Sequence, residues 1–193
     1  MNDNGWMQTV SGKRVFPLAP TVDAIDINDI AHALSMTCRF GGHTKFHYSV
    51  AQHSVLVSDQ AWDSCDGTER ECAEQALIGL LHDATEAYLV DVPRPIKKVL
   101  PEYMRLEDMM SVVIAKKFNI ASLYNNLIKG IDDAILVSEW KKLISPEVPR
   151  NILAYQTTKI DIEIDSWTQM EAKREFMTSF NDLNNILEIN TRS

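Results

Sequence analysis

The stretch from Glu69 to Ala87 constrains the fold of this chain most strongly. Its apolar residues recur with the 3.6-residue period of an α-helix and form one stripe: Ala73, Ala76, Leu77, Leu80 and Leu81. The pair His82-Asp83 follows this stripe directly. Two polar, ionisable side chains are costly to bury without partners. The sequence therefore predicts a buried helix that ends in a polar site.

Further segments share this helical spacing, and each is bounded by capping or turn residues. The first starts near Asn28, the proposed cap, and stops before Gly41-Gly42. The others span about Ser49 to Ala61, Tyr103 to Phe118, Leu123 to Leu143, and a C-terminal helix over about 166–188. This last helix is predicted to start after Asp165 or Ser166, with Gln169 completing a capping-box-like pattern.

The remaining segments are short or irregular. Residues 1–24 contain scattered Gly and Pro, which predicts an irregular arm with short strand pairing near Lys13 to Leu18. The segment Pro93-Arg94-Pro95 is predicted to be extended, because proline restricts its own φ and the residue before it. Strand-like alternation occurs at Lys159 to Ile164. The fold class expected from all segments is an all-α, compact helical bundle.

Length and composition narrow the class of protein further. A chain of 193 residues with 45% hydrophobic content is expected to form a single domain, 1–193. It has no apolar run of about 18 residues and no signal-like N-terminus, so we expect a cytoplasmic protein without a membrane partner. The net charge of -8 opposes a nucleic-acid surface, whereas a small anionic substrate in a cleft is compatible with it.

The cysteines point to the same compartment. Cys38, Cys65 and Cys72 form no CxxC pair, and three residues cannot make a fully paired disulfide set. We therefore expect ordinary thiols in a reducing environment.

The His82-Asp83 pair has candidate partners elsewhere in the chain. His53 lies on an earlier predicted helix and Asp132 on a later one. Divalent transition metals bind imidazole nitrogen together with carboxylate oxygen, and helical bundles collect such ligands from several helices. An isolated His-Asp pair is more often a surface pair or a helix end, so these residue types alone leave both interpretations open.

The order of these residues resembles the HD-domain phosphohydrolases. That family has a histidine, a later His-Asp pair and a distant aspartate, which match His53, His82, Asp83 and Asp132. The resemblance covers a motif-bearing core of about 12–143, through the blocks "DINDIAHALS", "RFGGHTKFHYSVAQHSV", "LLHDATEAYLVDVPRPIK" and "IDDAILVSEW". These blocks are similar to the branch of small 5'-deoxynucleotidases and, most closely in appearance, to phage dATP triphosphohydrolases.

The resemblance implies one catalytic divalent metal ion, either Zn, Co, Mn or Mg, and a homo-oligomer, dimeric or hexameric. Asp132 and Asp133 compete for the fourth ligand position. The family places a glutamate seven residues after the ligand, and Glu139 stands at that distance from Asp132. We therefore predict Asp132.

Catalytic roles also follow from the resemblance. Glu86 lies one turn after His82, and on a continuing helix it would project toward the same cavity. Its family counterpart positions or deprotonates the attacking water. The counterpart of Asp91 lies on the leaving-group side or contacts the sugar. Taken alone, either side chain would be interpreted as a solvated acid that caps a loop.

Five residues are predicted to bind substrate. Arg39 and Lys97 are the cations within the matching blocks and suit phosphate contacts. Phe40 could stack on the base, and Pro95 could supply a flat apolar wall. His43 is expected to contact substrate or to order its loop.

The expected reaction is hydrolysis at the α-phosphorus, with dATP and water giving deoxyadenosine and triphosphate, and with additional Mg accompanying the triphosphate. The choice of dATP comes from the resemblance of "RFGGH" and "VDVPRPIK" to the phage enzymes. Two alternatives stay open: a 5'-deoxynucleotidase that releases phosphate from monophosphates, and a nucleotide-binding HD module without turnover. An acidic helical interaction protein is a third interpretation.

Overall fold

The computed structural model describes residues 5–155, 160 and 162–189. It is mostly helical, which confirms the expected all-α class. The helices are α1 (Ile27–Met36), α2 (Val50–Asp63), α3 (Glu69–Leu81), α4 (Glu86–Leu89), α5 (Arg94–Lys97), α6 (Pro101–Lys117), α7 (Asn126–Glu139), α8 (Arg150–Leu153) and α9 (Gln169–Ile189). Short 3-10 turns lie at η1 (Val22–Ala24) and η2 (Arg39–Gly42), and a π-helical turn, η3 (Trp140–Ile144), follows α7.

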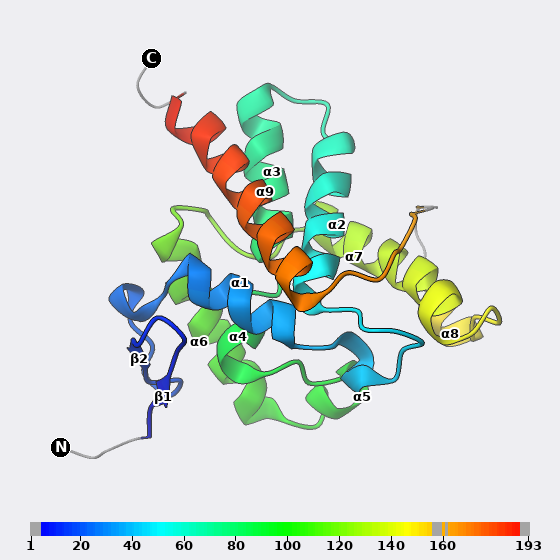
Figure 1. The fold of residues 1–193 in the computed structure, drawn as a ribbon, viewed down its shortest axis with the longest axis horizontal. Helices are drawn as coiled ribbons and strands as arrows, with labels where there is room; N and C mark the ends of the chain where they lie inside the picture. Colours follow the sequence, from blue (N-terminus) through cyan, green and yellow to red (C-terminus); the bar gives the residue numbers. More distant parts are fainter. Residues whose placement is uncertain (1–4, 156–159, 161, 190–193) are drawn as a thin grey trace.

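Helices α2 and α3 form the centre of the packing. They lie against each other, α9 packs across α1, α2 and α3, and α7 packs on α2 (Figure 1). Close approach of α2 and α3 requires Gly79, because a Cβ there would lie 3.1 Å from the backbone Cα of Ser58. The apolar stripe of α3 is buried in the main core, with residues such as Leu80 and Leu81 fully inaccessible.

The N-terminal arm contains the predicted strand pairing. Strands β1 (Met7–Gln8) and β2 (Arg14–Val15) form an antiparallel hairpin, with Met7 opposite Val15. Its turn is attached to α1, since the backbone N–H and the hydroxyl of Ser11 donate to the buried carboxylate of Asp29 at 2.8 and 2.7 Å. These two partly buried hydrogen bonds thus attach the arm to α1.

Two predicted helix starts are wrong by a few residues. Helix α1 is capped by Asp26, not Asn28, because the Asp26 carboxylate accepts from the Asn28 N–H at 2.9 Å. Helix α9 is capped by Thr168, whose hydroxyl accepts from the N–H of Glu171, while the Glu171 carboxylate accepts from the Thr168 N–H. Local side-chain bonds, and not the apolar period, set these boundaries.

The extended conformation predicted for Pro93-Arg94-Pro95 holds only at Pro93, where ψ is 135°. Arg94 and Pro95 begin α5, since the first turn of a helix needs no N–H from proline. The predicted alternation at Lys159 to Ile164 lies partly outside the described residues, and its described part, residues 160 and 162–164, is not in a strand.

The prediction of unpaired thiols is wrong for Cys65 and Cys72, which form a disulfide across the turn between α2 and α3. The turn places their Cα atoms 5.3 Å apart, within the range that the bond needs. Cys38 is a free cysteine. Sequence spacing did not show this proximity because it depends on how the α2–α3 turn folds back.

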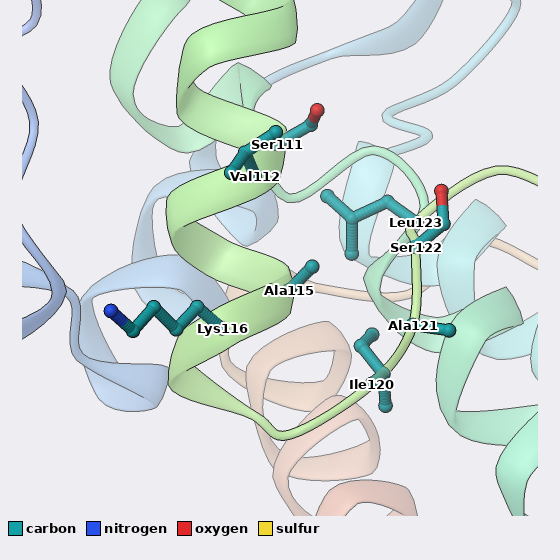
Figure 2. Close-up of a pocket in the computed structure, with 8 residues that line it drawn as sticks. All are labelled: Ser111, Val112, Ala115, Lys116, Ile120, Ala121, Ser122 and Leu123. Atoms are coloured by element: carbon teal, nitrogen blue, oxygen red, sulfur yellow. The ribbon is translucent and has the colours of Figure 1, made fainter.

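Two further observations concern a cavity away from the predicted site and the absence of a membrane-spanning helix among the described residues. A cavity of about 230 Å³ lies between the C-terminal half of α6 and residues 120–123, and none of its lining residues belongs to the predicted site (Figure 2). Among the described residues, we find no helix with the length and apolar character required to cross a membrane.

Candidate metal centre

The end of α3 differs from the continuous helix predicted through Glu86. The chain forms a turn at residues 82–85, and a new helix, α4, starts at Glu86. The N–H of Ala84 donates to Leu81 and that of Glu86 to Asp83, so the hydrogen bonds tighten to an i to i-3 pattern. His82 keeps helical dihedral angles at the end of α3, so the regular helix ends at the residues that are the predicted ligands.

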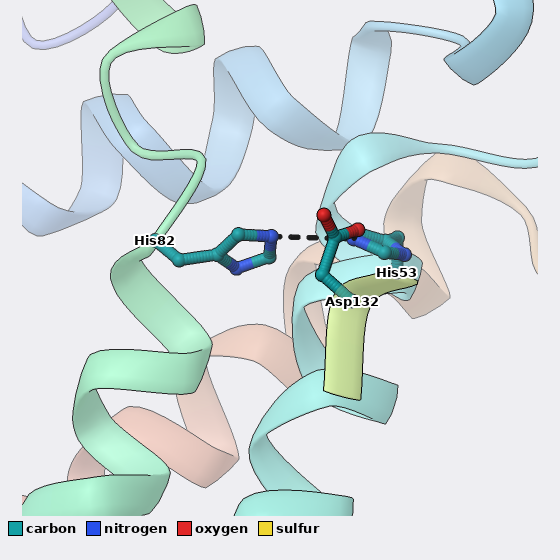
Figure 3. A group of neighbouring side chains, drawn as sticks. All are labelled: His53, His82 and Asp132. Carbon is teal, nitrogen blue, oxygen red and sulfur yellow. Dashed lines mark hydrogen bonds and ion pairs between the residues drawn. The ribbon is translucent and has the colours of Figure 1, made fainter. Parts of the chain in front are cut away.

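Three side chains converge beside this turn (Figure 3). His53 comes from α2, His82 from the end of α3 and Asp132 from α7. Nε2 of His53 lies 3.3 Å from Nε2 of His82 and 3.3 Å from Oδ1 of Asp132. One ligand atom from each residue lies within 4.8 Å of the other two, so these three residues could hold a metal ion.

The two imidazoles show why this group requires a cation. Nδ1 of His82 lies 2.7 Å from the backbone oxygen of Gly79, and Nδ1 of His53 lies 2.7 Å from Oε1 of Glu139. If each Nδ1 carries the proton for these acceptors, the Nε2 lone pairs of two neutral rings face each other. Only a proton or a metal ion between them removes this repulsion.

The spacing also fits a metal ion. Donor atoms bonded at about 2.0–2.2 Å to one ion lie roughly 3.0–3.5 Å from their neighbours in tetrahedral or octahedral arrangements. The distances of 3.3 Å between Nε2 of His53 and its neighbours His82 and Asp132 fall in that range. Imidazole nitrogen with carboxylate oxygen is also the donor set that Zn and similar transition metals accept.

Asp83, the fourth predicted ligand, is outside this group of three but lies against both histidines. Its Oδ2 is 3.2 Å from Nε2 of His82 and 3.7 Å from Nε2 of His53. The fold therefore brings three of the predicted ligands within reach of one ion and places Asp83 beside two of them. Asp133 instead binds Arg94 and Lys129, so that Asp132 is the aspartate of this pair that faces the histidines.

In the sequence, Glu139 served only to distinguish Asp132 from Asp133 by its spacing. In the structure, Glu139 is itself part of the site. It is fully buried, and its Oε1 accepts from the hydroxyl of Tyr48 at 2.7 Å as well as lying against His53. Burial acts to raise the pKa of Glu139, but Arg39 and His53 offset this and lower it to about 2. A carboxylate held ionised behind a ligand imidazole fixes the ring and increases its basicity.

Arg39, predicted to bind substrate, lies within the acidic group. It contacts Asp83 at 3.3 Å and Glu139 at 3.2 Å. Burial and Arg39 lower the pKa of His53, but Glu139 and Asp132 outweigh them and raise it to about 9. At neutral pH the metal-free group therefore carries a proton on His53, in the place where a metal ion would supply positive charge.

The predicted catalytic acids lie beside this group. Glu86 is buried, and among the described residues its Oε2 has no hydrogen-bond partner. Burial, reinforced by Asp83 and Asp91, raises the pKa of Glu86 well above its usual value. Burial also raises the pKa of Asp91. An unpaired buried carboxyl oxygen next to candidate metal ligands suggests a ligand or a reacting water.

The remaining residues predicted to bind substrate differ in burial and in their contacts. Lys97 is paired with Glu107 at 2.6 Å. Phe40 is half-buried with φ at 56°, its ring lying 5.6 Å from the Arg39 guanidinium, whereas His43 and Pro95 are exposed. Sequence reasoning missed Arg94, which binds Asp132; its position between two prolines in a matching block was the available signal.

Comparisons with known proteins show one family relationship. The chain is 40% identical over 138 residues to the uncharacterized protein YfdR of Escherichia coli, and the match covers 72% of each chain. It is 34% identical over 121 residues to the uncharacterized protein RCAP_rcc00048 of Rhodobacter capsulatus, covering 61% of this chain and 60% of that one. No family model matches the chain. The chain belongs to the family of YfdR, and neither relative's name states an activity.

Proposed function

We propose that this chain is a metal-dependent phosphohydrolase that cleaves a deoxynucleotide at the α-phosphorus, with dATP as the first-choice substrate. The observation that carries the proposal is the buried, unpaired Oε2 of Glu86 next to the group formed by His53, His82 and Asp132. A hydrolase needs a carboxyl group there to hold the attacking water, and the free Oε2 of Glu86 can accept that hydrogen bond.

The metal would be held by His53, His82 and Asp132, with Asp83 as the fourth ligand. When bound, a divalent ion neutralises charge on the phosphate oxygens and orients the phosphorus for in-line attack. Glu139 and Arg39 support this group from behind through their contacts with His53 and Asp83. We assign them to orientation and charge balance.

Two protons have to move during hydrolysis. Glu86 would accept the proton of the attacking water through its free Oε2. Asp91 would supply a proton to the 5'-oxygen that leaves, because the counterpart of Asp91 in the resembling family lies on the leaving-group side. The products are then deoxyadenosine and triphosphate.

The choice of base and phosphate number rests on the resemblance of the segments from Arg39 to His43 and from Val90 to Lys97 to phage dATP triphosphohydrolases. A nucleotidase that acts on monophosphates would use the same residues at the α-phosphorus. The difference lies in whether cations such as Lys97, now paired with Glu107, accept the outer phosphates. Product analysis separates these reactions.

The test is a panel of dNTPs and dNMPs with Mg²⁺, Mn²⁺, Co²⁺ or Zn²⁺, resolving phosphate from triphosphate. We expect triphosphate from dATP, loss of turnover in Asp83→Asn, and unchanged turnover in Asp66→Asn, a control at an exposed loop residue. Hydrolysis of monophosphates alone would contradict the dATP assignment. A protein that binds the metal and nucleotide but hydrolyses neither class would contradict the enzyme proposal and favour a binding module.

A further inference from the structure

Arg94 connects the segment 90–97, which includes Asp91 and α5, to the candidate metal centre. Its guanidinium lies 2.6 Å from Oδ2 of Asp132 through one terminal nitrogen and 2.8 Å from Oδ1 of Asp133 through the other. The Asp132 and Asp133 side chains are only 16% and 9% exposed, whereas the Arg94 side chain reaches them from the surface and is 44% exposed. One arginine thus bridges two adjacent carboxylates, and one of these, that of Asp132, also lies against His53.

The arginine is held in place from several directions. Pro93 and Pro95 flank it and restrict the backbone. The ring of Tyr155 lies 5.3 Å from its guanidinium carbon. Lys129, one turn before Asp133 on α7, occupies the other oxygen of that carboxylate. A side chain confined in this way can hold its partner in one orientation.

The consequence falls on Asp132. Its Oδ2 is taken by Arg94, while its Oδ1 lies 3.3 Å from Nε2 of His53 and faces the other candidate ligands. We infer that Arg94 is a positioning residue for the metal centre: by occupying Oδ2, it directs Asp132 to bind the metal through Oδ1 alone. The inference rests on the metal centre of the proposed function.

The same contact attaches the segment that carries Asp91 to α7. This segment is held at two further points, where the Tyr103 hydroxyl donates to the Val90 carbonyl at 2.6 Å and Lys97 pairs with Glu107 at 2.6 Å. Because those two anchors lie on α6, removing Arg94 releases Asp132 while leaving the segment attached to the bundle. A variant of Arg94 therefore tests the ligand and not the fold of the segment.

The experiment titrates Co²⁺ alone into the metal-stripped full chain and follows affinity by calorimetry and coordination by the visible absorption of Co²⁺. Arg94→Met is expected to weaken Co²⁺ binding about 10- to 100-fold, the usual effect of losing a partner of a ligand. Its visible absorption should also weaken, since a second Asp132 oxygen raises the coordination number and higher-coordinate Co²⁺ absorbs less. Arg94→Lys, which can still donate to Oδ2, should restore the spectrum and part of the affinity.

Arg105→Met is the matched control, because Arg105 is 65% exposed and pairs only with Glu102 in the salt bridges of the described residues. Wild-type affinity and spectrum in a folded Arg94→Met protein would overturn the inference, as would equal losses in the Met and Lys variants with an unchanged spectrum. Should Arg94→Met fail to fold, the Lys variant decides by its spectrum. Co²⁺ binding by the unmodified chain without nucleotide hydrolysis would remove the proposed activity alone, whereas no Co²⁺ binding would remove both.

Discussion

Nδ1 of His53 lies 2.7 Å from Oε1 of Glu139, and both side chains are completely inaccessible to solvent. This contact fixes the ring of His53 so that its Nε2 faces His82 and Asp132. The carboxylate also makes the imidazole a stronger electron donor toward a metal. The buried pair thus links the C-terminal residue of α7 to the candidate ligand on α2.

Glu139→Gln should weaken metal binding about 10- to 100-fold, because the amide keeps the shape but loses the charge that supports the imidazole. Calorimetric titration with Co²⁺ measures this loss. Glu74→Gln, which removes a carboxylate from an exposed ion pair with Arg70, serves as the control. Equal affinities for the two variants would show that Glu139 does not act through His53.

Asp132→Asn and Asp133→Asn should have unequal effects, although the residues are adjacent. Asp132 faces the histidines, whereas Asp133 pairs with Arg94 and Lys129. We expect Asp132→Asn to abolish measurable Co²⁺ binding and Asp133→Asn to reduce it by tenfold or less, which the same titration quantifies. The reverse order would assign the fourth ligand position to Asp133.

Glu86→Gln should lower kcat by about 10²- to 10⁴-fold and leave metal affinity within a fewfold of wild type, since Glu86 acts on water and not on the metal. The wild-type rate should rise with pH through the raised pKa of Glu86, because the base is active only when ionised. This acid limb should be absent from the residual activity of the variant. Retention of the wild-type rate would refute the role assigned to Glu86.

The raised pKa of Glu86 also predicts how the stability of the folded protein depends on pH. Its folded-state pKa is raised above the unfolded value, so its contribution to stability is present below about pH 4.3 and is lost as pH rises through the folded pKa. Glutamine mimics the protonated acid at every pH. The melting temperature of Glu86→Gln minus that of the wild type should therefore increase from pH 4 to pH 7 in metal-free protein. A difference that stays constant would mean that Glu86 is not desolvated.

Gly79→Ala should destabilise the protein, although alanine is the better helix former by about 1 kcal/mol. The added Cβ would lie 3.1 Å from both the Cα of Ser58 and the backbone oxygen of Val57, so α2 and α3 would have to separate. That shift moves His53 relative to His82. We expect a lower melting temperature together with weaker Co²⁺ binding; a stabilised variant with unchanged affinity would show that the interface can relax.

The amino-acid sequence by itself determined the helical class and the membership of the candidate site. The period of Ala73, Ala76 and Leu80 specifies which face of α3 is buried, because that information is contained in spacing along one helix. The burial cost of His82 and Asp83 at the end of an apolar helix indicated a polar site. The choice of His53 and Asp132 as their partners came from the resemblance of the residue order to the HD-domain phosphohydrolases.

Only the tertiary structure decided how those residues are supported. The contacts of Arg94 with Asp132 and of Glu139 with His53 join residues that are 38 and 86 positions apart in the chain. No local pattern records such distances, because hydrogen bonds and ion pairs between helices follow from packing and not from sequence separation. The sequence thus determined which side chains form the candidate centre, and three-dimensional packing determined which atoms of Asp132 and His53 face it.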